Sequence, residues 1–190
     1  MDTLFGKFTK TKKEPENQNY EECKPKEEEP LNFKVVFVGD MSVGAKTSFV
    51  NRYVKNMFYE YTEPTIGAAF CVKPTVSRGR KVKLEIWDTN GQTRYIQNAA
   101  RMYLKFAAGI VLGYDVTVRS SFEWLREYYI DPIKSVCPDA VVMVIGNKVD
   151  LVFEDGNRRG VSVEEGEELA REFGTNLFFE GKQTNILRLF

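Results

Sequence analysis

The sequence predicts an α/β fold in which a mostly parallel six-stranded sheet is flanked by helices. Two observations support this prediction. After residue 31, six apolar runs of strand length alternate with helical patterns, and most of these runs are almost continuously apolar. Runs of that kind are typical of parallel strands that are covered by helices on both faces. Because ligands of such sheets bind beyond the carboxyl ends of the strands, functional residues are expected in the loops that follow them.

The expected strands and helices are bounded by turn residues. The strands are residues 33–38, 68–76, 81–88, 109–116, 140–145 and 176–179, and a Ser-Arg-Gly turn joins the second to the third. Helices are expected over residues 45–54, from residue 122 onward, and over residues 163–173. Ser120 or Ser121 should cap the second helix, and Pro132 should bend or end it. Gly174 should close the third helix.

The first 31 residues are predicted to form a flexible charged arm, followed by a single domain over residues 32–190. Lys and Glu dominate the arm, and three prolines interrupt it, so it has little apolar surface to bury. At the other end, apolar residues begin a last helix that we expect to be truncated at Phe190. A longer version of the chain should therefore be more stable and should expose less apolar surface.

The composition excludes several classes of function. The chain has 190 residues, with 27 Lys and Arg against 27 Asp and Glu, and it contains no His. A net charge of zero argues against a nucleic-acid binder. The lack of His excludes His general bases and His-ligated metals, and no apolar run reaches the roughly 18 residues that span a bilayer. Three Cys without CxxC spacing fit a reducing, cytoplasmic setting.

The loop after the first strand has the features of a phosphate-binding loop. It reads GDMSVGAKTS and leads into a helix. Its glycines let successive N–H groups curl around an anion, and the helix N-terminus adds a partial positive charge. Lys46 can reach the outer phosphates, and the Thr47 hydroxyl can ligate magnesium. The residues expected to contact the nucleotide here are Gly39, Asp40, Ser42, Val43, Gly44, Ala45, Lys46, Thr47 and Ser48.

Two later loops carry matching chemistry. Asp88 ends an apolar run and is followed by Gly91 and Gln92; an acid there can hold a magnesium-bound water, and a glutamine can orient an attacking water. Farther on, Asn147-Lys148-Val149-Asp150 follows another buried run. The Asp150 carboxylate can accept two N–H bonds from the edge of guanine, a donor pair that adenine lacks. Three such segments, each after a strand, predict a guanine-nucleotide site.

On these motifs, residues 32–190 resemble the Ras-like small GTPases, and most closely the Rab family. The Rab-like segments are TIGAAF at 65–70, KLEIWDTNGQTRY at 83–95, YDVT at 114–117 and VSVEEGEELAREFG at 161–174. The resemblance implies the small G-protein fold of the P-loop NTPases, binding of GTP and GDP with Mg²⁺, and slow hydrolysis of GTP. It also implies two switch segments that present a surface to effectors in vesicle trafficking, an exchange factor and a GTPase-activating protein.

The resemblance also implies roles for single residues. The metal set is Thr47, Thr65 and Asp88, and Thr65 would also contact the γ-phosphate as the switch I threonine. Gln92 would be the catalytic residue, and Gly91 would contact the γ-phosphate. Phe58 would cover the guanine ring, and Asn147, Lys148 and Asp150 would contact the base. Gly181 and Lys182 would belong to a shortened form of the guanine-contacting Ser-Ala-Lys segment. Effectors are expected to read the aromatic residues Phe70, Trp87 and Tyr103.

Several departures from the family pattern leave alternatives open. Ala45 is an extra residue before the loop lysine, and Met41 stands where small residues are usual. These changes keep a second hypothesis open, a pseudo-GTPase binding module that holds nucleotide weakly or does not hydrolyse it. An ATP-using P-loop enzyme is a third alternative. No C-terminal Cys is present for prenylation, so we expect no direct membrane anchor in this chain and a peripheral endomembrane location only if a longer chain is lipidated.

Deletion of Ala45 is expected to tighten GTP binding by an order of magnitude or more. The extra residue should turn at least one loop N–H away from the phosphates, and such a charge-assisted bond contributes about 1.5–3 kcal/mol. Titration with a fluorescent GTP analogue measures the change. Met41→Gly in the deleted background should speed single-turnover phosphate release. Unchanged or weaker affinity after the deletion would show that the loop has adapted to its extra residue.

Overall fold

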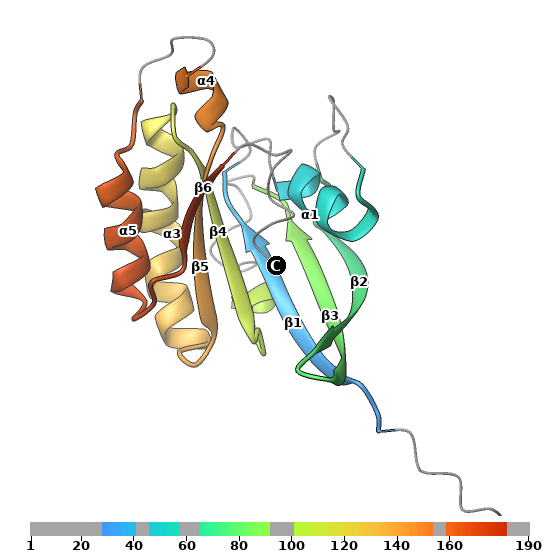
Figure 1. Cartoon of the computed structure of the whole chain (residues 1–190). Coiled ribbons are helices and arrows are strands. Elements are labelled where there is room, and N and C mark those ends of the chain that lie inside the picture. The colour runs from blue at the N-terminus through green and yellow to red at the C-terminus, as the bar shows by residue number, and fades with distance from the viewer. Residues whose placement is uncertain (1–27, 41–45, 58–64, 92–100, 154–158, 182–190) are drawn as a thin grey trace, which may run out of the picture.

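The computed structural model of the chain describes residues 28–40, 46–57, 65–91, 101–153 and 159–181. In this part of the chain, six strands form one sheet in the order β2-β3-β1-β4-β5-β6 (Figure 1). Only β2 runs antiparallel to its neighbour, and the other pairs are parallel. The predicted fold class is confirmed. The strands are β1 Leu31–Val38, β2 Ala68–Ser77, β3 Arg80–Thr89, β4 Gly109–Asp115, β5 Val141–Asn147 and β6 Phe178–Gly181.

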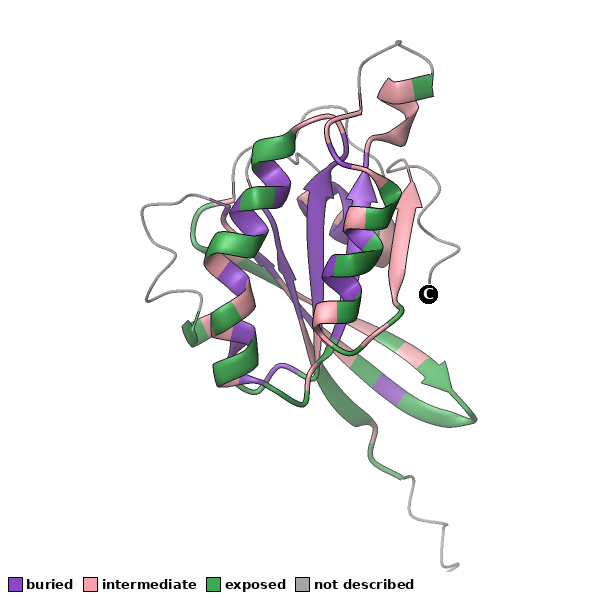
Figure 2. Cartoon of the chain, turned by 90° about the vertical axis from the view of Figure 1, so that its left-hand side faces the viewer, coloured by how far each residue is buried: buried purple, intermediate pink, exposed green. Residues whose placement is uncertain are grey.

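Helices cover both faces of this sheet. The helices are α1 Lys46–Lys55, α3 Arg119–Val136, α4 Val149–Phe153 and α5 Val163–Glu172, of which α4 lies at the top of Figure 1, beyond the strand ends. In Figure 1, α3 and α5 lie on one face and α1 lies on the other. Alternate residues of β1 serve the two faces, since Val36 belongs to the buried cluster under α3 and α5 and Phe37 to the cluster under α1. Figure 2 shows the resulting layers, with buried central strands and exposed outer helix surfaces.

The start of α3 differs from the prediction. The helix begins at Arg119 after Val118, and no side chain caps it, so the predicted cap at Ser120 or Ser121 is wrong. The Ser121 hydroxyl is used elsewhere, because it donates to the Val118 carbonyl at 2.7 Å and accepts from the Asp115 N–H at 3.0 Å. A tertiary contact with the end of β4 therefore replaces the local capping bond.

Pro132 lies inside α3, which continues to Val136, so of the two predicted effects the end of the helix is wrong and the bend stays a prediction. A proline removes one backbone donor. On either side of it, Tyr129 and Ile133 are buried in the core, and this packing holds the helix together across the missing bond.

The helix α5 begins and ends with strong local signals. Ser162 accepts from the Glu165 N–H at 3.2 Å, and the Glu165 carboxylate accepts from the Ser162 N–H at 2.9 Å, which forms a capping box. Gly174 follows the helix at φ +70°, as the sequence predicts for a closing glycine. Within the described ranges, no helix combines the length and hydropathy that a bilayer crossing needs.

Ser162→Ala is expected to lower the free energy of unfolding by about 1 kcal/mol, because α5 loses the side chain that caps it. Ser120→Ala is the matched control, since Ser120 lies exposed in the first turn of α3 and does not cap it; its effect should stay within about 0.5 kcal/mol. Urea denaturation of both variants measures the difference. Equal losses in the two variants would contradict the assigned cap.

Candidate functional site

The predicted site residues lie along one edge of the sheet. Because β1, β3, β4 and β5 are parallel, their carboxyl ends meet at the same edge, toward the top of Figure 1. Gly39 follows β1 at this edge and approaches β4 closely: a Cβ on Gly39 would lie 2.5 Å from the Gly113 carbonyl oxygen. Only glycine permits this contact, which brings the loop after β1 against the next strand.

Lys46 is the first residue of α1, and its amine is buried in the site. The amine donates to the Gly39 carbonyl at 2.6 Å and to the Asp40 carbonyl at 3.0 Å. Burial lowers the pKa of Lys46 to about 8, against the opposing attraction of Asp88 and Asp40. The amine and the α1 N-terminus together concentrate positive charge at one point, an arrangement that suits phosphate oxygens.

Three oxygen-bearing side chains converge beside Lys46. The Thr47 hydroxyl donates to Asp88 Oδ2 at 2.5 Å, and the Thr65 hydroxyl lies 3.0 Å from the Thr47 hydroxyl and 3.4 Å from Asp88 Oδ2. Asp88 is 1% exposed, and its Oδ1 has no hydrogen-bond partner in the described ranges. Burial raises the pKa of the Asp88 carboxyl, although Thr47 and Lys46 oppose the shift. Mg²⁺ prefers oxygen ligands. This cluster offers two hydroxyl groups and a carboxylate oxygen that has no hydrogen-bond partner among the described residues, so it fits Mg²⁺.

The residues predicted to read the base lie where β5 and β6 end. Asn147 is fully buried, and neither atom of its side-chain amide has a partner among the described residues. Gly181 is its register partner on β6. Lys148 follows at φ +64°, and Asp150 lies in the first turn of α4. The buried Asn147 amide and the Asp150 carboxylate at the start of α4 are therefore suited to polar contacts with the ring of a bound base.

The other predicted site residues fall into two groups. Gly91 is buried just after β3, and Ser48 is buried on α1 next to Thr47. Ser42, Val43, Gly44, Ala45, Phe58, Gln92 and Lys182 lie outside the described residues. Most of the predicted flexible arm and the predicted shortened last helix also lie outside the described residues.

The three aromatic residues predicted for effector binding form one cluster. The ring centroids of Phe70 and Trp87 are 5.1 Å apart, and those of Trp87 and Tyr103 are 6.2 Å apart. Lys34 Nζ lies 5.1 Å from the centroid of the Trp87 ring. Phe70 is 52% exposed, so the cluster presents apolar surface to solvent.

Asp115 ends β4 at the same edge and pairs in register with Asn147, and none of the sequence motifs assigned it a role. The available signal was its position, since it too is a polar residue directly after an apolar run. Its carboxylate lies 2.8 Å from Lys148 Nζ.

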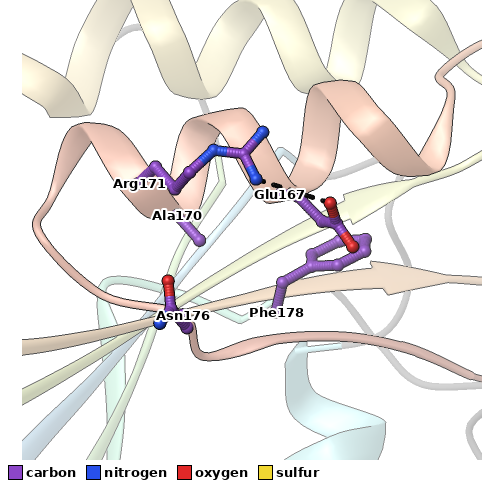
Figure 3. A pocket seen from close by; sticks show the side chains of 5 residues that line it. All are labelled: Glu167, Ala170, Arg171, Asn176 and Phe178. Atoms are coloured by element: carbon purple, nitrogen blue, oxygen red, sulfur yellow. Dashed lines mark hydrogen bonds and ion pairs between the residues drawn. The ribbon is translucent and has the colours of Figure 1, made fainter.

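A small pocket between α5 and β6 lies away from this edge. Figure 3 shows its lining, which comprises Glu167, Ala170, Arg171, Asn176 and Phe178. Arg171 donates to Glu167 across it at 3.5 Å. The pocket is at the amino end of β6, whereas the candidate site is at the carboxyl ends of the strands, so it is not part of that site.

The fold and the arrangement of this edge are those of the P-loop NTPase class. Comparison with protein families matches residues 34–186 to the Ras family. Ras-related protein RHN1 of Nicotiana plumbaginifolia is 44% identical over 149 residues, which cover 78% of this chain and 70% of the relative. Ras-related protein Rab5 of Nicotiana tabacum is 42% identical over the same shares of the two chains. GTP-binding protein ypt5 of Schizosaccharomyces pombe is 40% identical over 158 residues, which cover 82% of this chain and 72% of the relative.

The chain therefore belongs to the Ras family of small GTPases, and its relatives put it among the Rab proteins. The resemblance deduced from its motifs is confirmed, and so is its assignment as a GTPase. The alternative of a pseudo-GTPase module receives no support from these relatives.

The nucleotide-free protein is expected to gain stability from Lys46 as the pH rises from about 8 to about 10.5. The folded state holds the Lys46 proton less tightly than the unfolded state does, so unfolding takes up protons in this window and its free energy increases with pH. In Lys46→Met this contribution is absent. Denaturation of the wild type and the variant across the window measures it.

Lys55→Met, a change of an exposed lysine at the end of the same helix, is the control for that comparison. Its stability should follow the wild-type pH dependence. A pH-independent difference between the wild type and Lys46→Met would contradict the depressed pKa.

Proposed function

We propose that this chain binds GTP and GDP with Mg²⁺, hydrolyses GTP, and acts as a Rab-type switch for effectors in vesicle trafficking. The observation that best supports this proposal is the Thr47–Asp88–Thr65 cluster. Its members come from α1, from the end of β3 and from the segment before β2, and they meet through their oxygens. A contact of this kind lets the segment that carries Thr65 respond to what is bound beside Lys46.

Each part of the proposed site has a distinct task. Lys46 and the α1 N-terminus bind the phosphates, while Asn147 and Asp150 read the base. Thr47, Thr65 and Asp88 hold the magnesium, which when bound offsets negative charge on the phosphates. Gln92 is proposed to orient the attacking water. Bound phosphates would favour the charged form of the buried Lys46 amine, against the lowering of its pKa by burial.

The effector surface is proposed to be coupled to this site through β3. Trp87 and Asp88 are neighbours on that strand, so the same element carries the acid of the metal set and the centre of the aromatic cluster. We propose that effectors bind the GTP form there, and that an exchange factor and a GTPase-activating protein act on the same switch segments. Residues 32–190 would form the GTPase domain, with residues 1–31 as its arm. A peripheral endomembrane location would follow if a longer chain is lipidated.

Extraction of nucleotide from the purified protein tests the proposal. Bound GDP or GTP, followed by phosphate release when the protein is loaded with GTP, supports it. Bound ADP, or an empty protein that takes up neither guanine nucleotide, would contradict it.

Asp150→Asn is expected to weaken GTP binding by at least about 2–3 kcal/mol, because an amide mispairs with the two N–H donors of guanine. Xanthosine triphosphate should then bind the variant better than GTP does, since its base has an acceptor in place of one donor. Competition titrations of both nucleotides measure the preference. Asp139→Asn, an exposed change in the turn before β5, should leave it unaltered. A variant that still prefers GTP would show that Asp150 does not read the base.

A further inference from the structure

Asp115 is a buried carboxylate at the end of β4, and both of its oxygens are engaged. It is 2% exposed. Its Oδ1 accepts from the Thr117 N–H at 2.9 Å and from the Thr117 hydroxyl at 2.6 Å, and its Oδ2 lies 2.8 Å from Lys148 Nζ. A carboxylate with this many fixed partners is held in one orientation. Asp115 therefore offers Lys148 a rigid anchor on the neighbouring strand.

Lys148 needs such an anchor because of its backbone. It adopts φ +64°, in the left-handed region, which is costly for a residue with a Cβ. At this residue the chain turns from β5 into α4, and the Leu151 N–H donates to the Lys148 carbonyl at 3.1 Å in the first turn of the helix. The conformation of Lys148 thus sets where α4 begins, and with it the position of Asp150.

A second tether lies beside the ion pair. The Val116 N–H donates to the Asn147 carbonyl at 3.0 Å, which continues the pairing of Asp115 with Asn147. The turn after β4 and the turn after β5 are thus joined by one backbone bond and by one ion pair. The backbone bond fixes Asn147, whereas the ion pair acts one residue later, at the left-handed turn itself.

From this geometry we infer that Asp115 is a positioning residue for guanine recognition. Through Lys148 it holds residues 147–150 in the shape that presents Asn147 and Asp150 to the base. The inference rests on the proposed guanine-nucleotide site and adds a determinant of its specificity. Asp115 acts through Lys148 and not through a contact with the nucleotide.

Asp115→Asn tests this role with little change of shape. Its amide oxygen can still accept from Thr117, but its NH₂ group faces the Lys148 amine, so two donors meet and the anchor is lost. We expect GDP to bind about tenfold more weakly, the effect of losing one hydrogen bond to a charged group. Inosine diphosphate, which lacks the exocyclic amine, should lose less, so the preference for GDP over inosine diphosphate should fall about threefold or more.

Two controls separate this effect from general destabilisation. Thr117→Val removes a hydroxyl bond to the same carboxylate but keeps the ion pair, and Glu172→Gln breaks the 2.6 Å ion pair with Arg126 away from the site. Both should keep the wild-type nucleotide preference. If Asp115→Asn does not fold, Lys148→Met removes the partially exposed partner and should lower the same preference. In the double variant the loss should be no greater than in the more strongly affected single variant, because Asp115 acts only through Lys148.

The outcomes distinguish this inference from the proposed function. A wild-type protein that binds neither nucleotide contradicts both. A wild-type protein that prefers GDP, together with a folded Asp115→Asn or Lys148→Met variant of unchanged preference, overturns the positioning role alone. Equal losses for GDP and inosine diphosphate would also overturn it, since they would show a general loss of binding.

Discussion

Parallel pairing of β1 with both β3 and β4 is the constraint on which the rest of the structure depends. It brings the carboxyl ends of these strands to one edge, where Gly39, Asp88 and Asp115 lie at the ends of their strands. The close approach of Gly39 to the Gly113 carbonyl keeps β1 and β4 together at this end. Because α1 starts directly after this loop, Lys46 and Thr47 are delivered to the same edge. With a different pairing, the polar residues at the ends of these strands would not meet at one edge of the sheet.

The same edge concentrates polar groups that a stable core would avoid. Lys46 and Asp88 are buried. Burial lowers the pKa of Lys46 and raises the pKa of Asp88, so it favours the neutral form of each side chain. The Asn147 amide is buried without partners among the described residues. Such groups are costly unless a ligand or ion completes their bonding. The apolar clusters on the two faces of the sheet offset this cost, a distribution that is common where a fold carries a binding site.

The sequence predicted those features that depend on local or strictly periodic signals. Apolar runs, most of them almost continuous, located all six strands, and Gly174 marked the end of α5. The motif residues could be placed at one edge because strand ends share an edge. The cap of α3 was mispredicted because the Ser121 hydroxyl bonds to the end of β4, a contact that no local pattern encodes. The ion pair of Asp115 with Lys148 was not predicted for the same reason, since Asp115 lies on β4, Lys148 lies in the turn after β5, and the two are far apart in sequence.

The place of Trp87 gives this protein a built-in optical reporter. The chain contains two tryptophans. Trp124 is buried against Tyr128 and Tyr129 on α3, in a packed environment away from the candidate site. Trp87 instead adjoins Asp88, lies between Phe70 and Tyr103, and has the Lys34 ammonium over its ring. The emission of an indole depends on nearby charge and on solvent contact, so changes in its spectrum would follow rearrangements of the aromatic cluster in real time and without an added label.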